Sequence, residues 1–128
     1  MGKKVSIELS KVPEYGETVN TTLLGKIDAD DPESYKIMVF IYLAERWWLK
    51  PSWQSPYCKI DKEGNWKCNI NTRMLDEKAT KIIAFVLPKD VMIDLRDLED
   101  QLAGMGSQLP LELYNKSPMS KQITRQEK

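Results

Sequence analysis

Aromatic and polar side chains gather in one short stretch of the sequence, between positions 47 and 57. The side chains are those of Trp47, Trp48, Lys50, Trp53, Gln54 and Tyr57. Aromatic rings exposed at the edge of a β-domain suit sugars, because the C–H faces of a sugar stack on a π-system. Lysine and amide groups beside such rings bind hydroxyls. The pattern predicts a carbohydrate-binding surface formed by these six residues.

The same tryptophans are also typical of the core of a β-sandwich, where a large ring closes one end of the packed layers. We expect Trp47 or Trp48 to be such a core residue, whereas Trp53 is the ring that we expect at the surface. The alternative to a glycan-binding surface is therefore a domain whose tryptophans are mainly internal.

Histidine is absent from the chain. Its absence excludes Ser-His-Asp and Cys-His catalysis and removes the commonest general base near neutral pH. Acidic residues are plentiful, but none marks a strand end or cleft typical of the paired carboxylates of glycosidases. We interpret the protein as non-catalytic, with no catalytic residue and no cofactor.

No metal site is expected. Two cysteines without histidine cannot supply the four ligands of a zinc site. Acidic side chains between Asp28 and Glu33 have the hard oxygen atoms that Ca²⁺ prefers, but they lack the EF-hand spacing. We interpret this acidic segment as turn chemistry, since Asp side chains bond nearby backbone and Pro32 fixes its φ angle.

The clearest hairpin lies between residues 57 and 70, with Gly64 expected in the left-handed conformation at its turn. The predicted register pairs Ile60 with Trp66 and Cys58 with Cys68, the two cysteines facing each other at a non-hydrogen-bonded position. A cross-strand disulfide is then geometrically reasonable. The alternative is a pair of buried free thiols, as in a reducing cytosol.

Charge and apolar patterning limit the partners. Nineteen basic and nineteen acidic residues give no net charge, so neither nucleic acid nor an anionic membrane is an expected partner. The longest apolar run, residues 37–44, is far shorter than a membrane span. The first residues lack the apolar region of a secretion signal.

Seven strands are predicted from period-two alternation and from apolar runs bounded by turn residues. They cover residues 5–9, 19–27, 35–43, 57–60, 65–70, 79–87 and 121–125. The third and sixth are apolar on both faces, which is typical of central strands covered on both sides. The length of 128 residues fits one domain, 1–128.

One helix is expected near residues 94–103, with Asp94 as its N-cap and Gly104 just beyond its end. Leu95, Leu98 and Leu102 share one face of it. This face can cover the aromatic residues on the second face of the central strands. The fold class is therefore all-β, a two-sheet immunoglobulin-like sandwich with one helical insertion.

Several segments together resemble a β-sandwich accessory module of secreted, mostly bacterial, carbohydrate-active proteins. The module pattern reads Y-x-V-x-V-Y-I, WW-T-K-P, D-G-x-W-x-C-D-I and A-T-x-I-A-A-F-L-x-P. Here it corresponds to residues 35–42, 47–51, 61–70 and 79–88. Leu49 replaces the usual Thr, Asn69 replaces the usual Asp, and Cys58 is an added partner for Cys68.

The resemblance implies a non-catalytic role, either glycan binding or spacing within a larger protein, and an extracellular location. The expected partners are a polysaccharide, or a parent enzyme or neighbouring domain. Two hypotheses remain open at this point. In one, exposed aromatic rings bind glycan; in the other, the domain is a structural spacer or protein-interaction module with its tryptophans in the core.

Overall fold

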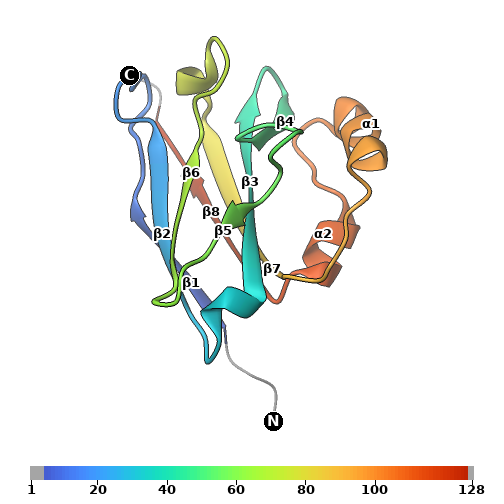
Figure 1. Cartoon of the computed structure of the whole chain (residues 1–128). Helices are drawn as coiled ribbons and strands as arrows, with labels where there is room; N and C mark the ends of the chain where they lie inside the picture. Colours follow the sequence, from blue (N-terminus) through green and yellow to red (C-terminus); the bar gives the residue numbers. More distant parts are fainter. Residues whose placement is uncertain (1–4, 127–128) are drawn as a thin grey trace.

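The chain forms two antiparallel sheets that pack face to face, as the computed structural model of residues 5–126 shows (Figure 1). The first sheet has the order β1 (Ser6–Lys11), β2 (Thr22–Asp28), β6 (Asn65–Asn69). The second has the order β4 (Arg46–Lys50), β3 (Tyr35–Leu43), β7 (Lys81–Pro88), β8 (Met119–Thr124), and β5 (Cys58–Lys59) also pairs with β3. The predicted all-β sandwich is confirmed.

The strand order is immunoglobulin-like. The first sheet corresponds to strands A, B and E, and the second to C′, C, F and G. Residues 5–126 contain eight strands rather than seven, because β4 was not predicted. Ala44 and Glu45 form a two-residue turn with φ angles of 55° and 64° that returns the chain along β3. Neither residue is typical of such a turn, which explains the missed hairpin.

The two central strands are buried on both faces, as their apolar pattern predicts. Ile37, Val39 and Ile41 of β3 point between the sheets, and alternate residues of β7 join them. On the other face, Met38 and Phe40 of β3 pack with Ile83 and Phe85 of β7 in a second core. The sandwich therefore has two apolar layers, one on each side of the β3–β7 pair.

Two helices cover the second core, both in the connection between β7 and β8 (Figure 1). They are α1 (Leu95–Met105) and α2 (Leu111–Lys116). The Asp94 carboxylate caps α1 by accepting from the Asp97 backbone N–H at 3.1 Å, as predicted. The helix ends at Met105, and the glycine that follows its end is Gly106, with φ 60°, rather than Gly104 as predicted. The short helix α2 was not predicted from the sequence.

Two 3₁₀ turns, η1 (Pro32–Ser34) and η2 (Asp76–Lys78), complete the structure. In η1 the Ser34 hydroxyl donates to the Asp31 carboxylate at 2.6 Å. The acidic segment is therefore a turn, but the Asp31 side chain bonds a hydroxyl where a bond to nearby backbone was expected. No group of three or more His, Cys, Asp or Glu side chains within residues 5–126 is placed to hold a metal ion.

The start of β1 and the end of β8 lie at opposite ends of the sandwich (Figure 1). At one end, Val5 and Ser6 line the same surface hollow as Pro118 and Met119. At the other, the Arg125 guanidinium that follows β8 donates to the carbonyl of Pro13, which follows β1.

Candidate functional site: the tryptophan segment

Trp47 belongs to the second core, the one beneath the helices, which we call the outer core. Its side chain is 2% exposed, and it packs beneath the helices with its ring 5.2 Å from that of Tyr42. The indole N–H donates to the Ser107 carbonyl at 3.0 Å, which satisfies its only polar group. The expectation that Trp47 or Trp48 is a core residue is confirmed for Trp47. In this structure Trp47 is not part of any surface.

Lys50 is also buried, at 3% exposure. Its ammonium lies 2.5 Å from the Asp76 carboxylate, which is 4% exposed, and 3.0 Å from the Thr72 hydroxyl. The same carboxylate accepts from the backbone N–H groups of Thr72 and Arg73. A buried charge needs such a partner, so Lys50 holds the 71–78 segment against β4 and is not available to a surface ligand.

Trp48 points to the opposite face of β4 and is half-buried against the inter-sheet core. Its indole N–H donates to the Leu43 carbonyl at 2.8 Å. The Arg46 guanidinium lies 4.0 Å from the ring centroid, in a cation–π contact. Core side chains pack against this ring and a cation lies over it, so little of it is left for stacking on a sugar.

Tyr57 is half-buried and lies under a cation too. The Lys36 ammonium is 3.8 Å from its ring centroid and donates to the Val91 carbonyl at 2.6 Å. Burial raises the pKa of the Tyr57 hydroxyl, and the Ile93 backbone and Lys116 oppose this shift. Burial also lowers the pKa of Lys36, which Asp90 opposes. The ring and the ammonium therefore partly desolvate each other.

Trp53 and Gln54 line a surface groove of about 300 Å³ with Trp48, Lys50, Arg73 and Glu99 among its other residues. Trp53 is half-buried against the outer core, and Gln54 is exposed. The structure thus brings Trp48, Lys50, Trp53 and Gln54 to one groove, whereas Trp47 and Tyr57 lie outside it. We call this depression the Trp53 groove.

Cys58 and Cys68 form a disulfide, but its setting differs from the prediction. The expected hairpin holds only near its turn, where Ile60 bridges Trp66 and Gly64 has a φ of 90°. Beyond that bridge β5 pairs with β3, and β6 pairs with β2. The bond therefore joins the two sheets rather than two paired strands, because the edge of β3 beyond β4 binds β5.

Arg125 is the residue that sequence reasoning missed. It is 6% exposed, and its guanidinium donates to five backbone carbonyls: those of Pro13, Glu14, Asp76, Glu77 and Ala79. Burial lowers the pKa of Arg125, while Tyr15 and Glu77 oppose the shift. A single basic residue near the end of a chain carries no sequence signal of such a role. It ties the end of β8 to two loops.

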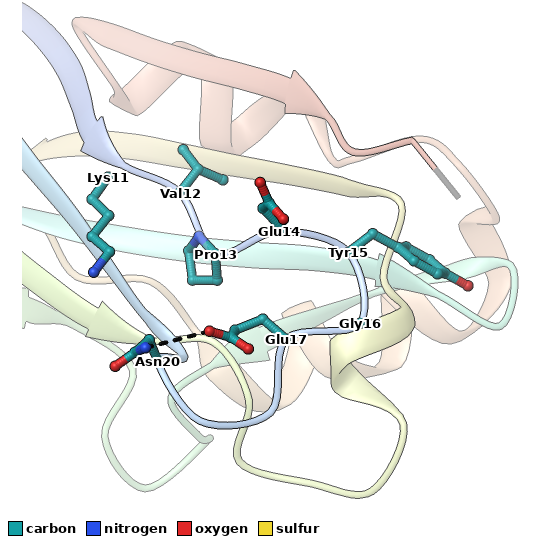
Figure 2. Close-up of a pocket in the computed structure, with 8 residues that line it drawn as sticks. All are labelled: Lys11, Val12, Pro13, Glu14, Tyr15, Gly16, Glu17 and Asn20. Atoms are coloured by element: carbon teal, nitrogen blue, oxygen red, sulfur yellow. Dashed lines mark hydrogen bonds between the residues drawn. The ribbon is translucent and has the colours of Figure 1, made fainter. Parts of the chain in front are cut away.

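One of these loops encloses a hollow of about 440 Å³ between β1 and β2, lined by residues between Lys11 and Asn20 (Figure 2). The Asn20 amide donates to the Glu17 carboxylate at 3.4 Å, and the Tyr15 ring points away from both side chains (Figure 2). The loop is also bonded to the η2 turn, since the Gly16 backbone N–H donates to the Glu77 carbonyl. We interpret the hollow as a by-product of this tethered loop.

Comparison with models of protein families, with curated proteins and with solved structures finds no match to the chain. Among residues 5–126, neither helix has the length and apolar character needed to cross a membrane.

Proposed function

We propose that this protein is a non-catalytic spacer domain that holds what flanks it at a fixed separation. The observation that carries the proposal is that the start of β1 and the end of β8 lie at opposite ends of the sandwich, with the end of β8 tied down by Arg125 (Figure 1). The Arg125 guanidinium, just after β8, donates hydrogen bonds to carbonyls of the loop that follows β1. From Ser6 to Pro13 an extended chain covers about 25 Å, which sets the separation.

The chemistry of the tryptophan segment supports the same proposal. Trp47 and Leu49 fill the outer core, Lys50 is used in a buried ion pair, and Trp48 lies beneath Arg46. These residues attach the β4 edge and the 71–78 segment to the sheet. A segment that stabilises both layers of the sandwich is what a rigid spacer requires.

Spin labels test the proposal. Cysteines introduced by Ser6→Cys and Gln126→Cys, both at exposed positions, would carry the labels, with the native disulfide intact. We expect one narrow distance distribution near 25 Å, widened only by the label linkers. Arg125→Ala should broaden it, because the end of β8 is then released. A broad distribution in the parent protein, or a distance below about 15 Å, would refute a fixed spacer.

A second candidate function is glycan binding at the Trp53 groove, which brings the indoles of Trp48 and Trp53 together with an amide, an arginine and a carboxylate. Stacking on Trp53, with hydroxyls bound by Gln54 and Glu99, fits a neutral sugar. Calorimetric titration with soluble β-glucan, xylan and mannan tests it. Binding that Trp53→Ala abolishes and Tyr57→Ala retains would support the groove, whereas no heat change at millimolar ligand would exclude it.

A further inference from the structure

A second groove, which shares no lining residue with the Trp53 groove, lies beside β5 and the start of β3. Its volume is about 530 Å³, within the range of small-molecule sites. Tyr35, Pro56, Tyr57 and Ile60 supply apolar wall surface. Lys89 closes one side, and its backbone N–H donates to the Ser34 carbonyl at 2.7 Å. We call it the lysine groove.

Three lysines line this groove, with Glu33 as its one acidic residue. Lys36 and Lys59 lie directly opposite each other in the β3–β5 register. Side chains at opposed positions of neighbouring strands share a face, and like charges there repel. Lys89 adds a third ammonium. The residues that line the groove therefore carry more positive than negative charge, although the chain as a whole carries no net charge.

None of these ammonium groups forms a close ion pair within the part of the chain that the structure describes, although the Asp90 carboxylate acts on Lys36 from a greater distance. No carboxylate among residues 5–126 lies within ion-pair distance of Lys36, Lys59 or Lys89. The partners of the Lys36 ammonium are the Val91 carbonyl and the face of the Tyr57 ring. Its pKa is lowered, mainly by burial, so an anion bound next to it would stabilise its charged form.

From this geometry we propose that the lysine groove binds a small organic carboxylate that carries a flat apolar ring. The carboxylate lies between Lys36, Lys59 and Lys89, and the ring lies against Pro56 and Tyr57. The cations select the charge, and the apolar walls select the ring. The lysine groove supplies both features, because its opposed lysine pair lies among largely apolar wall residues.

The test compares three probes that separate these contributions: 2-naphthoate, its neutral amide 2-naphthamide, and inorganic phosphate. The whole oxidised chain is titrated and followed by amide NMR. We expect 2-naphthoate to shift saturably the amides of residues 35–37 and 57–60, and the neutral amide to bind about tenfold more weakly. Phosphate alone should bind more weakly still, because it cannot use the apolar wall.

Charge-removing variants localise the effect. Lys59→Gln and Lys89→Gln should each weaken 2-naphthoate about three- to fivefold. Lys121→Gln, an exposed lysine on β8 outside the groove, should leave the affinity unchanged. Bound 2-naphthoate should also raise the pKa of Lys36, measured by side-chain NMR.

Three results would overturn the proposal. Equal binding of acid and amide would show an apolar hollow without charge selection. Equal binding of phosphate and naphthoate would show that the walls contribute nothing. Absence of any saturable shift at about 5 mM 2-naphthoate would show that the groove binds no such ligand.

Discussion

Replacement of Asp76 by Asn tests the buried network beneath the tryptophan segment. The variant is nearly isosteric, but it leaves the Lys50 ammonium, 3% exposed, without a counter-charge. Breaking a buried pair on one side costs about 3–5 kcal/mol. The backbone donors of Thr72 and Arg73 would also bond to a weaker acceptor. We therefore expect the free energy of unfolding to fall by about 4 kcal/mol. This is a large share of the roughly 5–15 kcal/mol by which native proteins are stable.

Urea unfolding followed by tryptophan fluorescence measures this loss. With a slope of about 1.5 kcal/mol per molar, the midpoint should fall by more than about 2 M. The matched control is Glu112→Gln, which breaks the exposed Lys116–Glu112 pair on α2, whose side chains are 39% and 42% exposed. Its cost should stay below about 0.5 kcal/mol.

A double-mutant cycle with Lys50→Met completes this test. The double variant should be less destabilised than the sum of the single variants, by at least about 2 kcal/mol, because it removes both charges together. A cost below about 1 kcal/mol for Asp76→Asn, or strict additivity in the cycle, would refute the reasoning.

Three further predictions concern other parts of the fold. Gly25→Ala should lower the free energy of unfolding by about 1–3 kcal/mol, since its new Cβ would collide with the Trp66 ring. At Gly104, near the end of α1, a new Cβ would contact no other atom, so Gly104→Ala should raise the free energy of unfolding by about 0.5 kcal/mol. Equal effects of the two alanine substitutions on the urea midpoint would contradict this. Ala44→Asn with Glu45→Gly should stabilise the β3–β4 turn by about 1 kcal/mol, because both residues have positive φ; a lower midpoint would count against it. Tyr57 has a raised pKa, so its hydroxyl contributes stability that is complete below its ordinary pKa of 10.0 and is lost as the pH rises through the folded value. Tyr57→Phe should therefore flatten the fall in stability above pH 10.0, and an unchanged slope would refute the shift.

Much of the fold follows from periodicity. The two-faced apolar runs of β3 and β7 identify the centre of the second sheet, and Leu98 and Leu102 identify the helix that covers it. These features are local patterns of residue type, which the sequence displays directly. The turn at Gly64 also follows from local chemistry, because a glycine in the hairpin loop adopts the positive φ that its turn requires.

The candidate site was harder to predict, because burial depends on contacts far apart in sequence. Lys50 resembles a surface lysine until Asp76, 26 residues later, is placed beside it. Arg125 reaches carbonyls more than 100 residues away. The partner strands of β5 and β6 likewise depend on competition between two sheets, so the hairpin pattern alone could not show that Cys58 and Cys68 join different sheets.

The central claim is that the tryptophan segment builds the fold of a spacer domain instead of forming a glycan platform. Fluorine NMR of the protein labelled with 5-fluorotryptophan tests this claim most directly, since the four tryptophans give separate signals. We expect the Trp47 and Trp66 signals, from side chains 2% and 3% exposed, to show no solvent isotope shift and no response to soluble glycans. A glycan-dependent shift of Trp47 or Trp48 would contradict the account.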